Sequence, residues 1–215
     1  SLAQFYAVGV DNSRPYRVMG GMQDNGSHMA YHTNPAGGPV YFEQWERVGG
    51  GDGMYNEIDW CENRHLYNES QFGPIRRTDL LTGETKGIRH NDPEMRWNWN
   101  APILISPHDC NVIFHAGNIL LRSEFRGEAW EIISPDLTKD DPATQTTGRG
   151  GDGNIQYGTI TTFDESPLKA GVIWVGTDDG NVQITKNGGE TWTHLNENIP
   201  DNPEYWVSRV EASHH

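Results

Sequence analysis

Short strand-like runs, bounded by turn residues, recur along the whole chain in sets of four. Each run alternates apolar and polar residues or is briefly apolar throughout, and helical spacing of apolar residues is almost absent. The runs that lead successive sets lie near Phe5, Ile58, Leu104, Ile160 and Val207, a spacing of roughly fifty residues. A four-stranded unit repeated at this period is typical of the blades of a β-propeller. A β-sandwich also has many short strands, but it does not explain turns that recur with the same chemistry.

The sequence therefore predicts an all-β chain, a β-propeller of four-stranded antiparallel blades with about four blades and one extra strand. The predicted blades cover approximately residues 1–48, 53–92, 100–138 and 154–200. Residues 203–215 are predicted to hold the leading strand of a further blade, running from Tyr205 to Ser213. Because the partners of this strand are not in the sequence, we expect the chain to be a segment of a larger propeller. The other blades, or another polypeptide chain, are then its expected partners.

Composition agrees with this fold and excludes some functions. Only 34% of the residues are hydrophobic, but eight Trp, eight Tyr and six Phe each supply a large buried area. The 25 Gly and 12 Pro residues allow the frequent turns that short strands need. A formal net charge of −14 argues against nucleic acid and anionic membranes as partners. No apolar run approaches the length of a membrane span, so we expect no membrane insertion.

The two cysteines, Cys61 and Cys110, both fall in predicted turns. A disulfide between them and two free thiols are both compatible with these positions, and the sequence leaves the choice open.

The stretch TKNGGETW, from Thr185 to Trp192, places a glycine turn directly before a tryptophan. The Asn187 side chain can hydrogen-bond backbone amides of its own turn, and Gly189 can take a positive φ. Trp192 then opens the next strand and packs under the hairpin. The pattern Thr185-x-Asn187-x-Gly189-x-Thr191-Trp192 thus predicts a locked turn between the third and fourth strands of a blade.

A degraded copy of this turn lies in the preceding blade. Ser123, Gly127 and Trp130 keep their places in RSEFRGEAW, while Phe125 and Ala129 replace the polar turn residue and the threonine. We interpret both turns as structural, and we expect Trp130 and Trp192 to be buried between strands or blades.

The pattern resembles the Asp-box, Ser/Thr-x-Asp-x-Gly-x-Thr-Trp, with Asn187 in the Asp position. Asp-box (BNR repeat) propellers include sialidases, xyloglucan-hydrolysing glycosidases, sortilin-type receptors and photosystem assembly factors. The phrases GGMQDNGS, GGGDGMY, VIWVGTDDGNVQITKNGGETW and WVSRVEASHH are similar to large secreted bacterial proteins described as sortilin-like or glycosyl-hydrolase-like. This resemblance covers most of the chain and implies an extracellular or periplasmic location. Neither the arginine triad of sialidases nor the catalytic Asp pair of the xyloglucanases can be aligned to this sequence.

In a propeller, second-to-third turns and blade-to-blade links share one face. In this sequence those loops carry amides, carboxylates and aromatic residues, which suit a neutral or cationic polar ligand such as a glycan or a peptide. Trp97 and Trp99 alternate in a polar link, so we expect one to be buried and the other to face outwards. The candidate ligand-binding residues are Gln23, Asn25, Tyr55, Arg96, Trp97, Trp99, Tyr157, Asp178, Trp206 and Arg209.

Three functions are compatible with these loops. The first is a non-catalytic binding propeller. The second is a glycoside hydrolase with Asp24, Asp52 and Asp152 as candidate catalytic residues, which requires carboxyl groups roughly 5 to 10 Å apart. The third is a purely structural scaffold or subunit-interaction propeller. Whether the chain is an enzyme is therefore left open, and glycoside hydrolase is the expected class if it is one.

Cofactors are not expected. The glycine-rich stretches at residues 49–53 and 149–153 are not followed by the lysine or helix of a phosphate cradle. The acidic turns suit calcium chemically, but the repeated GGxGxD spacing is absent. The histidines show no paired ligand spacing, so we expect no metal site.

Overall fold

The computed structural model describes residues 4–145, 156–201 and 205–215, and it is all-β in these ranges apart from two short 3-10 turns. Sixteen strands in the described residues form four antiparallel sheets of four strands each, in chain order across each sheet. These sheets are the blades of a β-propeller, as the sequence predicts. The chain divides into two compact units, Ser1–Arg89 (the N-terminal unit) and His90–His215 (the C-terminal unit), each with two blades.

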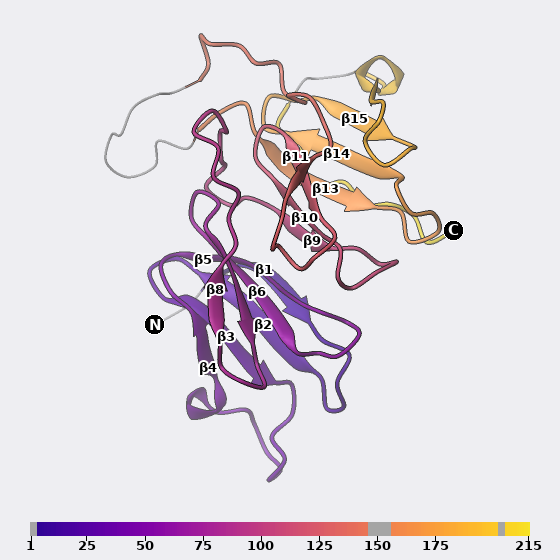
Figure 1. The fold of residues 1–215 in the computed structure, drawn as a ribbon. Helices are drawn as coiled ribbons and strands as arrows, with labels where there is room; N and C mark the ends of the chain where they lie inside the picture. The colour runs from indigo at the N-terminus through magenta and orange to yellow at the C-terminus, as the bar shows by residue number, and fades with distance from the viewer. Residues whose placement is uncertain (1–3, 146–155, 202–204) are drawn as a thin grey trace. The chain divides into compact units, whose positions relative to one another are not determined.

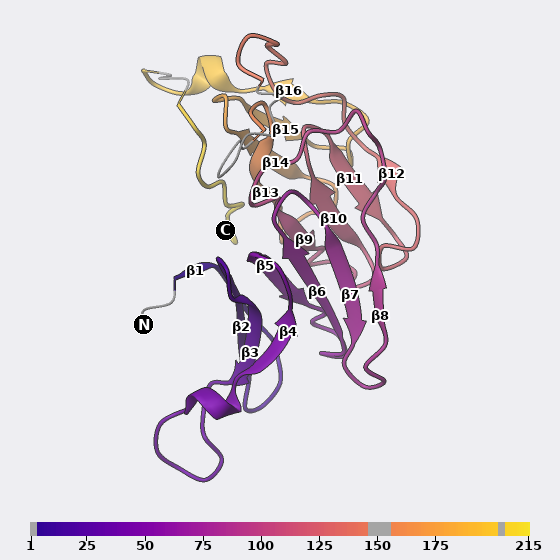
Figure 2. The ribbon, with the colours of Figure 1, turned by 90° about the vertical axis from the view of Figure 1, so that its left-hand side faces the viewer.

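In the N-terminal unit the two blades follow one another along the chain (Figure 2). The first blade consists of β1 (Phe5–Val10), β2 (Arg17–Met22), β3 (Gly26–Tyr31) and β4 (Glu46–Gly49). A 3-10 turn, Phe42–Gln44, precedes β4. The second blade consists of β5 (Gly53–Ile58), β6 (His65–Ser70), β7 (Ile75–Asp79) and β8 (Thr85–Gly87).

The core of the N-terminal unit lies between these two blades. Met19 on β2 is paired in register with Met29 on β3, so both side chains point to the same face. They pack with Ile58 and Leu66 of the second blade, and all four are at most 4% exposed. The alternation of apolar residues along each strand therefore selects the face on which the blades meet.

The C-terminal unit has the same organisation (Figure 1). Its first blade consists of β9 (Ile103–Ile105), β10 (Ile113–Ala116), β11 (Leu120–Ser123) and β12 (Glu131–Ile132). Its second blade consists of β13 (Ile160–Glu165), β14 (Ile173–Thr177), β15 (Val182–Thr185) and β16 (Thr193–His194), followed by the 3-10 turn Asn196–Asn198.

Among its described residues, two apolar clusters stabilise the C-terminal unit. In the larger one, Phe114 of the first blade meets Phe163 of the second edge to face, with ring centroids 6.3 Å apart. Ile173 and Val175 of β14 complete this inter-blade core. In the smaller cluster Trp97 packs with neighbours on the link before β9 and on β11, and only 2% of it is exposed.

The predicted locked turn is formed between β15 and β16. The Thr185 hydroxyl accepts a hydrogen bond from the Gly189 amide (3.0 Å), and the Asn187 carboxamide oxygen accepts one from the Thr191 amide (3.0 Å). Gly189 has a φ of 104°. The Trp192 indole N–H donates to the Ile133 carbonyl oxygen of the preceding blade (3.1 Å), and its ring packs against the larger core.

The degraded copy between β11 and β12 keeps part of this geometry. The Ser123 hydroxyl accepts hydrogen bonds from the Phe125 amide (3.3 Å) and the Gly127 amide (2.9 Å). Trp130 is half-buried against the smaller cluster. A hydroxyl that caps its own turn is thus common to both blades of this unit.

One expectation differs from the structure, and one choice that the sequence left open is decided by it. The segment predicted as a strand from Tyr205 to Ser213 has no strand pairing among the described residues, because its amides bond mainly to side chains of β13. Both Cys61 and Cys110 are disulfide-bonded, so the free-thiol alternative does not apply.

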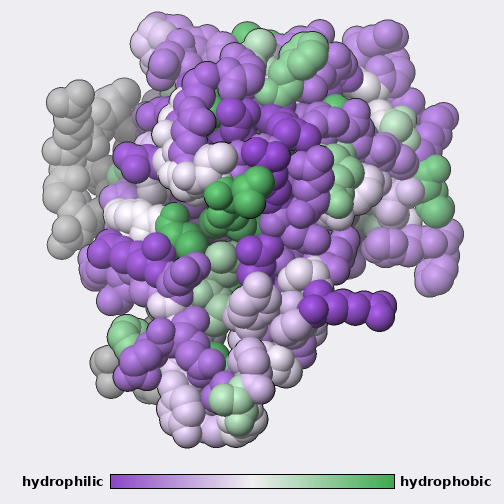
Figure 3. Space-filling model, turned by 60° about the horizontal axis from the view of Figure 1, so that its bottom comes forward, coloured by the Kyte–Doolittle hydropathy of each residue, from purple (hydrophilic) through white to green (hydrophobic). Residues whose placement is uncertain are grey.

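The surface is largely hydrophilic. On the face drawn in Figure 3, hydrophilic residues dominate and apolar ones are confined to small groups. None of the helices in the described ranges is long and apolar enough to span a membrane.

Candidate functional site

In the N-terminal unit, four predicted site residues gather where the β2–β3 turn meets the β4–β5 link: Gln23, Asp24, Asn25 and Asp52. The Asp24 amide donates to a carboxylate oxygen of Asp52 (2.6 Å), and the Asp52 amide donates to the Gln71 side-chain oxygen (2.9 Å). Asp24 takes a left-handed φ of 61°, which an aspartate tolerates in a turn. Asp52 therefore fixes the turn, and the Asp24 side chain is left exposed.

An exposed tyrosine lies beside this turn. The Tyr6 hydroxyl donates to the Gln23 side-chain oxygen (2.6 Å), and the Asn25 carboxamide donates to the Gln23 carbonyl oxygen (2.9 Å). Tyr6 is 36% exposed. Together Tyr6, Gln23, Asp24 and Asn25 form an exposed set of one phenol ring, two amides and one carboxylate, which we call the turn cluster.

Tyr6 was not predicted as a site residue, because the run around Phe5 was interpreted only as a strand. The signal was the adjacent pair Phe5-Tyr6. Neighbouring strand residues point to opposite faces, so the two rings cannot both enter one core. In the structure both are partly exposed, Phe5 by 39%.

In the C-terminal unit, Arg96 joins several loops. Its guanidinium donates to the Gly158 carbonyl oxygen (3.0 Å), the Asp136 carboxylate (2.6 Å) and the Thr138 hydroxyl (3.0 Å). The Arg96 backbone amide donates to the Asn118 carboxamide oxygen (2.9 Å). The guanidinium is therefore largely used inside the protein, and its role in this structure is to hold the loops together.

Asp178, another predicted ligand-binding residue, is only 1% exposed. Its carboxylate accepts the Gly158 amide (3.0 Å), the Thr159 amide (2.8 Å) and the Thr159 hydroxyl (2.6 Å). Burial raises the pKa of Asp178 despite these hydrogen bonds. Tyr157 donates its hydroxyl to the Asp178 carbonyl oxygen (3.1 Å), and burial, reinforced by the neighbouring carboxylates, raises the pKa of Tyr157.

Asp136 behaves in the opposite way. Burial alone would raise the pKa of its carboxyl group, but hydrogen bonds from Thr138, Asn118 and Arg96 outweigh burial and lower it. Asp136 is thus ionised and paired, while Asp178 is desolvated and joined to neutral donors.

The remaining candidates are scattered. Trp97 is buried in the smaller core cluster, which leaves no ring face for a ligand to stack on. Trp99 and Tyr55 are half-buried, so the predicted split of the two tryptophans is reproduced in part. Trp206 and Arg209 are exposed on the C-terminal segment. Asp152 lies outside the described residues.

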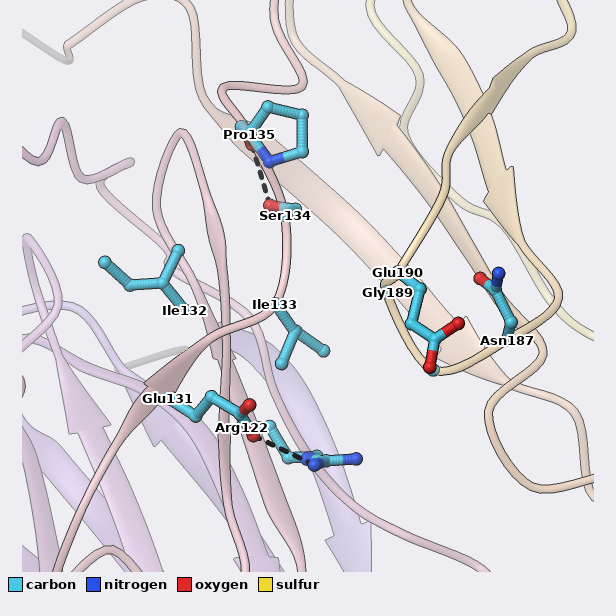
Figure 4. A pocket seen from close by; sticks show the side chains of 10 residues that line it. Arg122, Glu131, Ile132, Ile133, Ser134, Pro135, Asn187, Gly189 and Glu190 are labelled. Carbon is cyan, nitrogen blue, oxygen red and sulfur yellow. Dashed lines mark hydrogen bonds and ion pairs between the residues drawn. The ribbon is translucent and has the colours of Figure 1, made fainter.

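A shallow pocket of 430 Å³ lies where β12 faces the locked turn (Figure 4). Its charged side holds the Arg122 guanidinium, which pairs with Glu131 (2.9 Å) and Glu124 (3.3 Å). Sequence reasoning assigned these turns to structure alone and therefore missed the pocket. The lining residues are Arg122, Glu131, Ile132, Ile133, Ser134, Pro135, Asn187, Gly188, Gly189 and Glu190.

Within the described ranges, no three His, Cys, Asp or Glu side chains gather as a metal site requires. The polar loops therefore offer hydrogen-bonding chemistry: exposed amide, carboxylate and phenol groups in the turn cluster, and an internally satisfied network around Arg96 and Asp178.

The opposite pKa shifts of Asp178 and Asp136 predict opposite pH effects on stability. A raised folded-state pKa means that the contribution of Asp178 is complete below about pH 3.9, the unfolded value, and is lost as pH rises through the folded pKa. We therefore expect Asp178→Asn to gain stability relative to the parent chain as pH rises from 3.5 to 7. The measurement is the free energy of unfolding in urea at each pH.

Asp136→Asn is the matched control, because its lowered pKa reverses the sign. The stability that Asp136 contributes is present above about pH 3.9 and is lost as pH falls through the folded pKa. The Asp136→Asn variant should therefore lose stability relative to the parent chain as pH rises. Parallel pH profiles for the two variants would contradict both assignments.

Blades of four antiparallel strands, packed face to face and closed by capped turns, define the chain as a β-propeller. No family model and no curated protein matches it. Solved structures do match, among them a chain described as the extracellular domain of a one-component system from B. thetaiotaomicron. That match has a TM-score of 0.55 and 10% sequence identity, and it covers 86% of this chain and 22% of the other. The chain thus spans about a fifth of that structure, and the likeness concerns the fold.

Proposed function

We propose that this chain is part of an Asp-box propeller of the sialidase and sortilin superfamily that binds a neutral or cationic polar ligand, a glycan or a peptide. The turn cluster is the proposed binding site. Its net charge is negative and the whole chain carries −14, which disfavours anionic ligands. The locked turn from Thr185 to Trp192, with its hydroxyl and carboxamide caps, supports the Asp-box assignment.

The observation that carries the proposal is the hydrogen bond from the Tyr6 hydroxyl to Gln23 (2.6 Å). It holds an exposed aromatic ring beside the exposed side chains of Asp24 and Asn25. An aromatic face packs on the C–H groups of a sugar ring or on a side chain, while amides and a carboxylate fix hydroxyls or ammonium groups. Because Asp52 fixes the backbone of the turn, these groups are preorganised, which lowers the entropy cost of binding.

Binding is favoured over glycoside hydrolysis because of how the candidate acids are used. A hydrolase needs two carboxyl groups flanking one pocket, with the pKa of one raised by burial. Asp52 accepts a backbone amide, and the carboxylate of Asp178, whose pKa burial raises, is surrounded by internal donors. Among the candidate acids that the structure describes, Asp24 is the exposed one, and its side chain can meet a ligand.

An extracellular or periplasmic location is part of the proposal. Both cysteines are disulfide-bonded, and disulfides persist mainly in oxidising compartments. The resemblance to secreted bacterial proteins points the same way.

The test begins with a glycan array and a peptide library probed with the parent chain, with hydrolysis of each bound glycan monitored. We expect Tyr6→Ala to weaken the best ligand by about 1 to 3 kcal/mol, a magnitude borrowed from stacking on bases. Tyr205→Ala is the matched control, because Tyr205 is also an exposed tyrosine but lies in the C-terminal unit. The affinity of the Tyr205→Ala variant for the same ligand should equal that of the parent chain. Affinities are measured by titration calorimetry.

Two results would overturn the proposed site. If the Tyr6→Ala and Tyr205→Ala variants bind the ligand with equal affinity, the turn cluster is not the binding site. Turnover of a glycan that stops in Asp24→Asn, while binding survives, would establish the hydrolase alternative instead.

A further inference from the structure

The C-terminal segment Tyr205–His215 lies on the outer face of the last blade. Along β13, Phe163 points into the inter-blade core, so its neighbours Thr162 and Asp164 point to the opposite face. The Val210 amide donates to the Thr162 hydroxyl (3.1 Å), and the Ala212 amide donates to the Asp164 carboxylate (2.8 Å). The segment is therefore seated on the face that no other blade of the C-terminal unit covers.

Its first contact repeats one that β13 makes with the preceding blade. The Ile160 amide, at the start of β13, donates to the carbonyl oxygen of Gly117, the residue after β10 (2.8 Å). The Val207 amide donates to the carbonyl oxygen of Thr177, the last residue of β14 (3.0 Å). In both cases a leading residue bonds to the end of the second strand of the blade before it.

Its last contact repeats a turn found after two leading strands. The Ser106 hydroxyl after β9 accepts the amide of the residue two positions on (3.2 Å), and Ser166 after β13 does the same (3.3 Å). The Ser213 hydroxyl accepts the His215 amide (3.1 Å). The interval from Val207 to Ser213 equals that from Ile160 to Ser166, so the two ends of the segment match β13 in register.

Between these ends, backbone amides that bond to the blade alternate with amides that do not, as in a strand with one open edge. The amides of Val210 and Ala212 bond to the blade. Within the described ranges, the amides of Arg209 and Glu211 have no hydrogen-bond partner, and both residues are exposed. A row of unpaired amides at period two accepts an antiparallel strand.

We infer that the open edge of Tyr205–His215 takes an antiparallel β-strand and becomes the leading strand of a further blade. The strand it accepts resembles β14. Val210 stands at the position of Phe163, and Phe163 pairs with Val175 of β14. The incoming strand therefore carries apolar residues at alternate positions, as Ile173 and Val175 do on β14, so that they enter a new inter-blade core.

The probe for this edge is a synthetic peptide with the sequence of residues 171–180, GVIWVGTDDG, added to the parent chain. Hydrogen exchange followed residue by residue should show Val207, Val210 and Ala212 protected without peptide. Saturating peptide should then slow exchange at Arg209 and Glu211 by at least about tenfold, as expected for a newly formed backbone hydrogen bond.

Glu211→Pro isolates the edge, because it removes one outward amide and leaves the Val210 and Ala212 hydrogen bonds in place. We expect this variant to weaken peptide binding by about tenfold or more with an unchanged melting temperature. Glu211→Ala keeps the amide and is the matched control, with binding as in the parent chain. The readout is independent of the glycan or peptide ligand of the turn cluster.

Three outcomes would overturn the inference. Fast exchange at Val207, Val210 and Ala212 in the parent chain would show that the segment is not seated on the blade. Unchanged exchange at Arg209 and Glu211 with saturating peptide would make the segment a cap and not a leading strand. Dimers of the parent chain that dissociate in Glu211→Pro would assign the edge to a second copy of this chain.

Discussion

Replacing Trp192 with alanine should lower the free energy of unfolding of the C-terminal unit by about 3 kcal/mol, the lower end of the range for truncating a tryptophan, because the ring is half-buried. The ring packs against the inter-blade core and its indole N–H bonds to the Ile133 carbonyl oxygen (3.1 Å). Alanine therefore leaves a cavity beneath the locked turn and an orphaned carbonyl on the preceding blade. Differential scanning calorimetry or urea unfolding measures the loss.

Trp192→Phe separates these two causes. It keeps most of the apolar area but removes the donor to Ile133, so it should cost about 1 kcal/mol. Ligand affinity in the folded fraction should be unchanged for both variants, because the turn cluster belongs to the N-terminal unit. A melting temperature for Trp192→Ala equal to that of the parent chain would refute the inter-blade role of this residue.

The strands could be predicted from sequence because they are local. Four of the five predicted leading runs, those near Phe5, Ile58, Leu104 and Ile160, coincide with β1, β5, β9 and β13, the first strands of the four blades. The locked turn was predictable for the same reason. Its hydrogen bonds join Thr185, Asn187, Gly189 and Thr191, which are close in sequence.

The site was harder to predict because burial of polar residues depends on distant loops. Asp178 lies in a DDG turn that looks solvated, yet its carboxylate accepts the Gly158 and Thr159 amides, which directly precede the paired strand β13 and lie about twenty residues away in sequence. Trp97 sits in a polar link but is covered by Met95 and Leu121. Neither environment has a signature in the flanking residues.

Tyr6, an exposed residue of the turn cluster, was not predicted as a site residue for a different reason. Tyr6 belongs to a strand, so the pattern that identified the strand also hid a functional candidate. Its partner Gln23 lies on the next turn, and the two meet only because β1 and β2 are paired. The sequence therefore predicted the turn cluster from its loop side and not from its strand side.

Gly21→Ala should destabilise the N-terminal unit by about 3 kcal/mol, the upper end of the range for overpacking. A methyl group at Gly21 would lie 2.1 Å from the Gly53 carbonyl carbon and 2.3 Å from the Met54 amide nitrogen. Both are backbone atoms of the neighbouring blade, so no side-chain rotation relieves the clash and the two blades must move apart. Separating them also loosens the contacts of Met19 with Ile58 and Leu66.

Gly87→Ala is the matched control for this backbone contact. Gly87 lies on the edge strand β8 of the same unit, and an added methyl group meets no atom within 4 Å. This variant should therefore change the free energy of unfolding by less than about 1 kcal/mol, and the change should favour the folded state because alanine restricts the unfolded chain. Urea unfolding of both variants decides the matter. If Gly21→Ala and Gly87→Ala unfold at the same urea concentration, the backbones of the two blades are not in close contact at Gly21. The blades are then held together by the apolar side chains between them.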